Sequence, residues 1–252
     1  MQTATAPKFA PQTIEGVFKH PAGELLFRLF NNEVCIRISE QILAGHTYPE
    51  VSFVSGVRII LDIGANIGAA AIWLGTTYPA ATVYALEPGG RQFGLLQQNA
   101  ASLANVRLFP FGLFSSDKSV PLYSGRNDSV ESSVCPTGRT ADESENIALR
   151  SASQFLSEQQ LEQIDILKLD TEGCEVPILR SLKDFLPTMK LIYVEYHSER
   201  DRRLIDEILA DTHVLWRGHT PLVYRGEFCY LRRDLVPPPK ETHTCEILLP
   251  LD

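Results

Sequence analysis

The sequence lacks the patterns that mark several classes of protein. No apolar stretch approaches the roughly 18 residues that a membrane-spanning helix needs, so membrane insertion is not expected. The 5 cysteines are odd in number and form no Cys-x-x-Cys pair, which argues against structural zinc and a disulfide framework. Lys and Arg number 23 against 31 Asp and Glu, and the net charge of −8 disfavours general nucleic-acid binding.

The first residues also lack the features of a secretory signal. Met1–Pro11 contain one lysine and no apolar core of the kind that a signal peptide carries. Scattered cysteines fit a reducing compartment, so a cytoplasmic location is predicted. We expect residues 1–13 to form a flexible tail and residues 14–54 to form an N-terminal extension, with strand-like pieces at 25–30 and 34–38.

From residue 55 to residue 252 the chain reads as one domain of alternating strands and helices. Expected strands are residues 58–63, 82–86, 106–111, 164–169 and 191–197, and expected helices lie near 67–77, after Pro88, near 153–160, after Gly173 and at 200–210. Residues 213–232 read as two antiparallel strands that close one edge. Pro110 predicts an edge position for the third strand. The order predicts an α/β fold, a mostly parallel sheet with helices on both faces.

A polar segment interrupts this alternation. Residues 124–146 are rich in Ser, Gly, Thr, Asn and Asp and contain few large apolar residues. Loops of this length inside a compact domain are often lids or binding loops. We therefore expect a mobile loop that is a candidate lid or substrate loop.

The most informative segment is the turn Asp62-Ile63-Gly64-Ala65-Asn66-Ile67-Gly68. Apolar residues lead into it, as in a buried parallel strand, and its glycines allow a sharp turn and close approach to a ligand. The spacing is not the Gly-x-Gly-x-x-Gly of dinucleotide binders. The Asp62 carboxylate would repel a pyrophosphate and attract an ammonium group, which S-adenosylmethionine (SAM) carries. A tight turn without ligand, with Asn66 capping the helix, is the structural alternative.

Glu87 supplies a second signal at the end of the next strand. It lies 23 positions after Gly64, where an acid can accept hydrogen bonds from both ribose hydroxyls of a nucleoside. An exposed acid before a turn is the alternative interpretation. The glycine turn and Glu87 together predict a nucleoside site, and Asp62 with the missing Gly-x-Gly favours SAM over NAD.

Three segments together resemble the FkbM family of SAM-dependent methyltransferases: residues 61–68, 86–88 and 164–175. The resemblance covers about 55–215 and implies a Rossmann-like class I methyltransferase fold with a seven-stranded sheet. It implies that the turn with Asp62, Gly64, Asn66 and Gly68 holds the methionine part of SAM, that Glu87 holds the ribose, and that Gly112 and Leu113 face the adenine. Many members of this family methylate hydroxyl groups of sugars or natural products.

Methyl transfer to a hydroxyl benefits from a general base, and the strand ends offer candidates. Asp170 and Glu172 share one face of an extended backbone after Lys168, and His197 ends the following strand. A structural ion-pair cluster and a locally bonded histidine are the alternatives. Two carboxylates are too few for a metal site, so no metal is predicted. Tyr48 precedes the first strand and is a candidate to fold over the cofactor.

These observations predict a SAM-dependent methyltransferase that methylates a hydroxyl of a small molecule, sugar or natural product. The expected partner is therefore a small-molecule or glycan acceptor. N-methylation of a protein or metabolite remains an alternative in which a neutral amine needs no base. A non-catalytic SAM-binding module and a nicotinamide oxidoreductase are alternatives from other classes.

Overall fold

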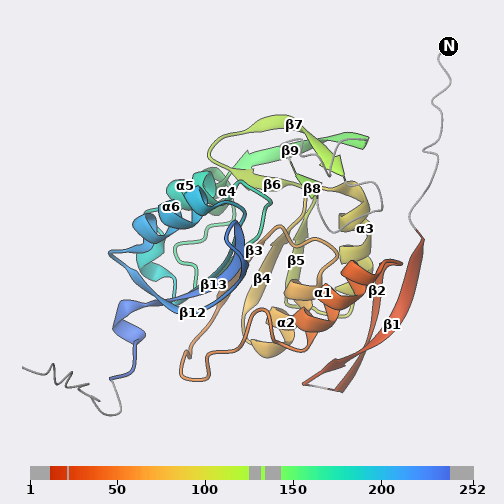
Figure 1. Ribbon diagram of the computed structural model, residues 1–252, viewed down its shortest axis with the longest axis horizontal. Helices are drawn as coiled ribbons and strands as arrows, with labels where there is room; N and C mark the ends of the chain where they lie inside the picture. Colours follow the sequence, from red (N-terminus) through yellow and green to blue (C-terminus); the bar gives the residue numbers. More distant parts are fainter. Residues whose placement is uncertain (1–11, 22, 125–131, 134–142, 239–252) are drawn as a thin grey trace, which may run out of the picture.

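A seven-stranded sheet forms the centre of the molecule in the computed structural model, which describes residues 12–21, 23–124, 132–133 and 143–238 (Figure 1). Its strand order is β12-β13-β11-β10-β3-β4-β5. The parallel strands are β3 (Ile59–Ile63), β4 (Thr82–Leu86), β5 (Val106–Phe109), β10 (Ile166–Leu169) and β11 (Leu191–Tyr196). The antiparallel strands β12 (His213–Leu222) and β13 (Arg225–Arg232) close one edge, and β5 forms the other. The mostly parallel sheet and both predicted edges are confirmed.

Helices cover both faces of this sheet, as the alternation predicts. On one face pack α4 (Ala152–Glu158), α5 (Glu175–Ser181) and α6 (Glu199–Leu209), and on the other pack α2 (Ala69–Thr77) and α3 (Gly90–Asn99). Short 3-10 turns occur at Leu186–Thr188 and Arg233–Leu235. Neighbouring strand residues bury opposite faces: Ile60 joins the core under α2 and Leu61 the core under α5. Strands buried on both faces need continuous apolar runs, and those runs made them recognisable in the sequence.

The N-terminal extension contains a hairpin and a helix. Strands β1 (Thr13–His20) and β2 (Gly23–Phe30) pair antiparallel, and α1 (Glu33–Leu43) follows. The strand predicted at 34–38 is wrong, because the Asn32 side chain accepts a hydrogen bond from the Cys35 N–H at 2.8 Å and starts a helix there. The buried residues of α1 recur every four positions, which is helical spacing, at Cys35, Ser39 and Leu43.

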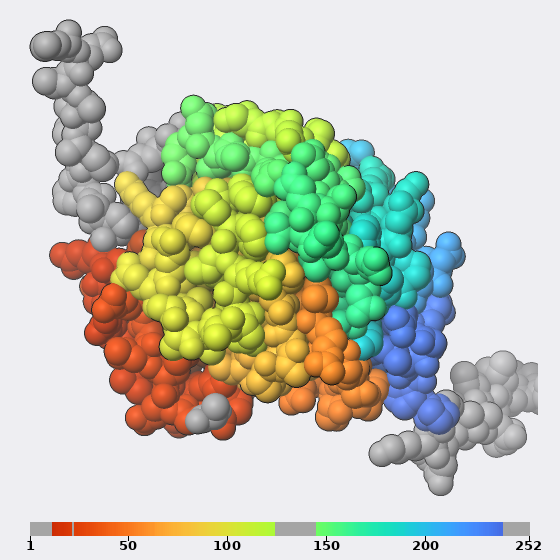
Figure 2. All heavy atoms as spheres, turned by 180° about the vertical axis from the view of Figure 1, so that it is seen from behind, coloured from red at the N-terminus to blue at the C-terminus, as the bar shows by residue number. Residues whose placement is uncertain are grey.

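A second, smaller sheet has the order β6-β9-β7-β8, with bounds Gly112–Phe114, Glu143–Ser151, Lys118–Ser124 and Ser132–Ser133. In Figure 2 its yellow-green and green segments lie side by side on the surface. The loop predicted at 124–146 is wrong at Ser124, at Ser132–Ser133 and at residues 143–146, because these residues belong to the paired strands β7, β8 and β9. The rest of the expected lid, 125–131 and 134–142, lies outside the described residues, as does the expected tail up to residue 11.

The strand order determines where a ligand site can form. The chain leaves β3 toward β4 and β5 on one side and later returns to β10 on the other side, so β3 and β10 flank the switch point of the sheet. Ligands of open α/β sheets bind beyond the carboxyl ends of the strands at such a point. Within the described ranges, no helix has the length and apolarity to cross a membrane.

Candidate active site

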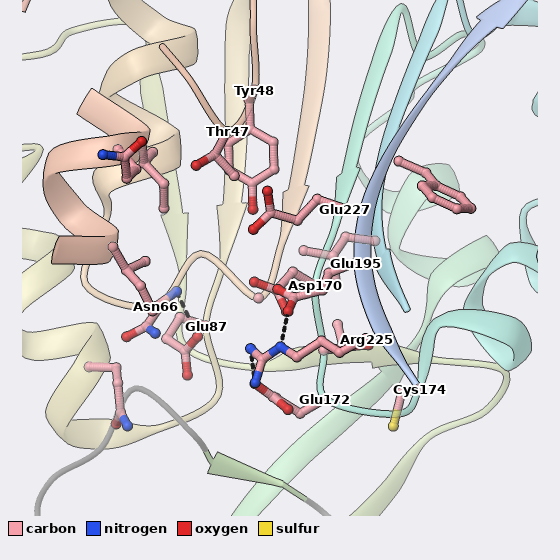
Figure 3. A pocket seen from close by; sticks show the side chains of 18 of the residues that line it. Thr47, Tyr48, Asn66, Glu87, Asp170, Glu172, Cys174, Glu195, Arg225 and Glu227 are labelled. Atoms are coloured by element: carbon pink, nitrogen blue, oxygen red, sulfur yellow. Dashed lines mark hydrogen bonds and ion pairs between the residues drawn. The ribbon is translucent and has the colours of Figure 1, made fainter. Parts of the chain in front are cut away.

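A cavity of about 990 Å³ opens at the carboxyl ends of the central strands (Figure 3). That volume is at the upper end of the range for small-molecule sites, so it leaves room for a nucleoside cofactor and an acceptor. Most of the sequence-predicted site residues line it: Tyr48, Gly64, Asn66, Glu87, Gly112, Leu113, Asp170 and Glu172. Three predicted residues do not belong to its lining: Asp62, Gly68 and His197.

The turn after β3 depends on its glycines. Gly64 has a positive φ of 78°, and a Cβ there would lie 1.8 Å from the backbone oxygen of Asp170. Only glycine therefore allows the turn to pack against the end of β10. Gly68, with φ of 98°, is the N-cap of α2, and a Cβ on it would lie 2.8 Å from Leu96 Cδ1. Asn66 is therefore not the N-cap of α2. Because Gly68 has no side chain, the start of α2 can pack closely against Leu96 behind the turn.

Glu87 joins this turn to the end of β4. Its Oε2 accepts a hydrogen bond from the Asn66 N–H at 2.8 Å, and its Oε1 accepts one from the Gly89 N–H at 2.8 Å. Glu87 is 7% exposed, so the interpretation as a solvent-exposed acid is wrong. Burial raises the pKa of Glu87 to about 7, although the two backbone hydrogen bonds oppose this rise. Its remaining lone pairs can accept hydrogen bonds from a ligand in the cavity.

A fully buried ion pair lies behind the turn. Lys168 Nζ is 3.2 Å from Asp62 Oδ1 and 3.9 Å from Asp170 Oδ2, and it donates a hydrogen bond to the Gly64 carbonyl at 2.5 Å. Burial opposes the charge on Lys168, but Asp62 and Asp170 outweigh it and raise the pKa of the lysine. The Asp62 carboxylate thus faces Lys168 and not the cavity, and Lys168 links it to the glycine turn.

The segment after β10 is held by a buried glutamate. Glu175 is fully buried at the start of α5, and its Oε1 accepts hydrogen bonds from the Thr171 N–H at 2.9 Å and the Gly173 N–H at 3.2 Å. Glu172 and Gly173 both have positive φ, 52° and 109°. This geometry explains the pattern Asp-x-Glu-Gly-x-Glu, because its last acid fixes the turn that presents Asp170 and Glu172.

His197 lies among four carboxylates. Its Nε2 is 3.1 Å from Glu172 and 4.0 Å from Asp170, and its Nδ1 is 3.3 Å from Glu175. Burial lowers the pKa of His197, but the nearby carboxylates of Glu172 and Glu175 outweigh burial and raise it to about 11. A protonated imidazole has no lone pair to accept a proton. The geometry therefore makes His197 a cation that orients carboxylates, and not a general base near neutral pH.

One ligand atom from each of Asp170, Glu172 and His197 lies within 4.8 Å of the others. A metal ion at this place would have to displace the proton that His197 carries. The three residues could therefore hold a metal ion only once His197 has lost that proton.

Three charged residues at the site were not among those predicted from the sequence. Arg225 of β13 contacts Glu195 and lies 3.5 Å from Glu172, and Glu195 is directly opposite Glu227 across β11 and β13. Burial and Asp170 raise the pKa of Glu195 to about 8, against Arg225 and His197. Arg225 and Glu227 alternate with buried residues near the start of β13. Two charged residues at this spacing lie on one face of a strand, and this pattern could have identified them in the sequence.

Comparisons of the sequence with known proteins point to one family. The profile of the Methyltransferase FkbM domain matches residues 62–213, more than half of the chain. Methyltransferase sdnD of Sordaria araneosa is 29% identical over 178 residues, covering 58% of this chain and 68% of that protein. The 2-O-methyltransferase NoeI of Sinorhizobium fredii is 25% identical over 155 residues, covering 56% of this chain and 64% of that protein.

A solved structure resembles the fold. The fibrillarin pre-rRNA processing protein of Methanococcus jannaschii has a TM-score of 0.50 at 12% identity, and the likeness covers 86% of this chain and 82% of that one. The fold is that of the Rossmann-like class I methyltransferases. The profile match spans the glycine turn, Glu87 and the segment after β10, and it confirms the resemblance seen in the sequence. The alternative of a nicotinamide oxidoreductase is therefore wrong. The chain therefore belongs to the FkbM family of SAM-dependent methyltransferases.

Proposed function

We propose that this enzyme transfers the methyl group of SAM to a hydroxyl group of a small molecule, sugar or natural product. The position of Asp170 carries this proposal. It follows β10 directly beside the Gly64 turn, it lines the cavity, and its side chain is 26% exposed. A carboxylate in that place can accept the proton of a hydroxyl next to the cofactor. The name of NoeI, a 2-O-methyltransferase, supports oxygen as the acceptor atom.

The cofactor would lie along the ends of β3 and β4. The exposed backbone of Gly64 and Asn66 would hold the methionine part, Glu87 would accept hydrogen bonds from the ribose hydroxyls, and Gly112 and Leu113 would face the adenine. Tyr48 would form the opposite wall. Asp62 and Gly68 would act from behind the turn, Asp62 through Lys168 and Gly68 by starting α2.

Asp170 is the proposed general base. When bound, SAM would supply a methyl group on a positively charged sulfur, and the electron pair of the carbon–sulfur bond would stay on that sulfur when the methyl group is transferred to the acceptor oxygen. Asp170 would take the proton of the hydroxyl, and Lys168 at 3.9 Å and His197 at 4.0 Å would hold its carboxylate in place. Glu172 and His197 hold Asp170 in place as positioning residues, and this orientation contributes to the rate.

The N-terminal extension, residues 14–54, would take part in acceptor selection on the catalytic domain, residues 55–252. Its helix α1 contributes Val34, Arg37 and Gln41 to the cavity lining. The cavity is thus bounded on one side by a segment outside the matched 62–213. This arrangement would allow acceptors to vary while the cofactor side stays the same.

The substitution Asp170→Asn tests the proposal. It removes the base but keeps the side-chain size, so kcat should fall by about 10²–10⁴-fold. Binding of S-adenosylhomocysteine (SAH), measured by calorimetry, should stay within about threefold of the original enzyme. Products made with ¹³C-methyl SAM from metabolite extracts should show the label on oxygen by NMR. A label on nitrogen, with turnover unaffected by Asp170→Asn, would contradict the proposal and favour N-methylation.

A further inference from the structure

Three carboxylates lie side by side on neighbouring strands at the acceptor end of the cavity: Asp170, Glu195 and Glu227. Leu169 pairs with Val194 in the parallel ladder, so Asp170 and Glu195 come next to each other. Glu195 in turn pairs with Glu227 across the antiparallel ladder. Like charges directly opposite each other destabilise a sheet, so the fold alone does not account for this row.

The cations around this row are fewer than the carboxylates that they contact. Arg225 is shared between Glu195 and Glu172, and His197 is shared among Glu172, Glu175, Glu195 and Asp170. Lys168 is shared between Asp170 and Asp62. Glu227 makes neither a hydrogen bond nor an ion pair with any residue in the described ranges. Burial and neighbouring acids raise the pKa of Glu195 to about 8 and also raise that of Glu227, so a cationic ligand group beside them would favour their ionised forms.

A tyrosine hydroxyl points at the same place. Tyr48 is 4% exposed, and its hydroxyl makes no hydrogen bond within the part of the chain that the structure describes. Figure 3 shows the Tyr48 hydroxyl directed into the cavity toward Glu227 and Asp170. Tyr48 lines the cavity, so its hydroxyl is available for a hydrogen bond with a polar ligand group.

We propose that Tyr48, Glu195 and Glu227 form a subsite for an ammonium group on the methyl acceptor. The proposal rests on the proposed function. Neighbouring strands lie about 4.8 Å apart, so Glu227 lies about 10 Å from Asp170 and beyond the methionine end of a cofactor at the Gly64 turn. The charge is therefore available to the acceptor. A hydroxyl oxygen and two carboxylates are the hydrogen-bond acceptors that an ammonium group needs.

This subsite also fits oxygen as the methylated atom. An amine held between carboxylates stays protonated, because nearby negative charge raises its pKa. A protonated amine has no lone pair and cannot take a methyl group. The acceptor would thus be an amino compound that receives the methyl group on a neighbouring hydroxyl.

The test compares three sugars that share one ring and differ in charge: glucosamine, glucose and glucuronate. Calorimetry with the SAH-loaded enzyme should show glucosamine binding at least about tenfold more tightly than glucose, and glucuronate more weakly than glucose. Glu227→Gln should reduce the preference for glucosamine to less than about threefold. Glu207→Gln, the same change at an exposed position of α6, should leave the preference intact.

Equal binding of the three sugars, binding of none, or a preference that survives Glu227→Gln would overturn the subsite. Micromolar binding of Mg²⁺ that depends on Glu227 would assign the row to a metal instead and would also overturn it. SAH affinity, measured for each variant, separates damage to the cofactor site from loss of the subsite. A methyl label on nitrogen would contradict the proposed function, whereas a missing charge preference would contradict the subsite only.

Discussion

Charge at individual residues decides which groups at this site can perform chemistry. Glu87 and His197 are both partly buried ionisable groups at strand ends, yet burial raises the pKa of the acid to about 7 while carboxylates raise that of the histidine to about 11. The histidine therefore stays charged across the physiological range and the glutamate does not. Both residues directly follow a strand in the sequence, so the difference between their pKa values comes from their neighbours in space.

The charge on His197 leads to a testable dependence of stability on pH. Its pKa is about 11 in the folded protein against an ordinary value of 6.5, so its contribution to stability is complete below pH 6.5 and is lost as the pH rises through 11. His197→Gln should therefore have a lower free energy of unfolding than the original protein, and this deficit should be larger at pH 6 than at pH 9.5. Urea unfolding followed by circular dichroism measures both values.

The sign of that trend is the informative part. A histidine buried in neutral form would have a lowered pKa, as His213 does at about 4, and would lose stability toward acid. His213→Gln is thus the matched control, and its deficit should not shrink between pH 6 and pH 9.5. A deficit of His197→Gln that grows with pH would show that the imidazole is not held as a cation.

Residue roles were predictable where they depend on local position and not where they depend on partners across strands. Glu87 was found because acids at the end of the second strand have a known use, and the structure places it in the cavity wall. Asp62 was expected to face a ligand, but strand alternation and burial turn it toward Lys168. Glu227 was missed because its significance comes from Glu195 on a different strand.

At the scale of elements, burial on both faces made the central strands easy to recognise. The strand predicted at 34–38 was wrong because this short segment lacks such burial on both faces. Five residues fit a strand and a helix equally well, and the capping side chain of Asn32 decides for the helix. The segment 143–146 was read as a loop because its polar composition hides its pairing with β7. Both errors lie in elements whose pattern is weak over a short window.

The strands β3 and β10 are tied together by Lys168, and this link should serve cofactor binding as well as stability. Lys168→Met leaves Asp62 buried without its partner and should lower the free energy of unfolding by about 3–5 kcal/mol. The double variant Asp62→Asn/Lys168→Met removes both charges and should recover most of that loss. It still lacks the donor to the Gly64 carbonyl, so SAH should bind roughly tenfold more weakly in both variants.

Urea unfolding and calorimetry with SAH distinguish the two roles of Lys168. Lys168→Arg keeps the charge and a donor and serves as the conservative control, with SAH affinity expected between those of the original enzyme and Lys168→Met. A double variant that regains both stability and SAH affinity would show that Lys168 only compensates Asp62. Loss of stability without change in SAH affinity would lead to the same conclusion.

At the scale of the whole molecule, the cavity is assembled from parts that lie far apart in the sequence. The proposed cofactor side comes from the ends of β3 and β4, and the ends of β10 and β11 add Asp170 and Glu195. Other parts of the wall come from α1, the second sheet and the β12–β13 pair, through Arg37, Leu122, Ile147 and His219. A local motif can identify the first group because it is contiguous. The acceptor side depends on long-range packing, which explains why no specific acceptor could be predicted from the sequence.

Because the cavity joins these parts, occupation by the cofactor product should stabilise the whole fold. SAH at 100 times its dissociation constant should add about 2.7 kcal/mol to the free energy of unfolding. For a chain of 252 residues this corresponds to a rise in Tm of roughly 5–10 °C, measurable by differential scanning calorimetry.

NAD at the same concentration should leave Tm unchanged, because the turn lacks the Gly-x-Gly-x-x-Gly that accommodates a pyrophosphate. Glu87→Gln keeps the size of the side chain but places an amide donor where one carboxylate oxygen accepts a backbone N–H, so the rise should be smaller. A rise with NAD that matches the rise with SAH would mean that the turn does not discriminate between the two nucleosides.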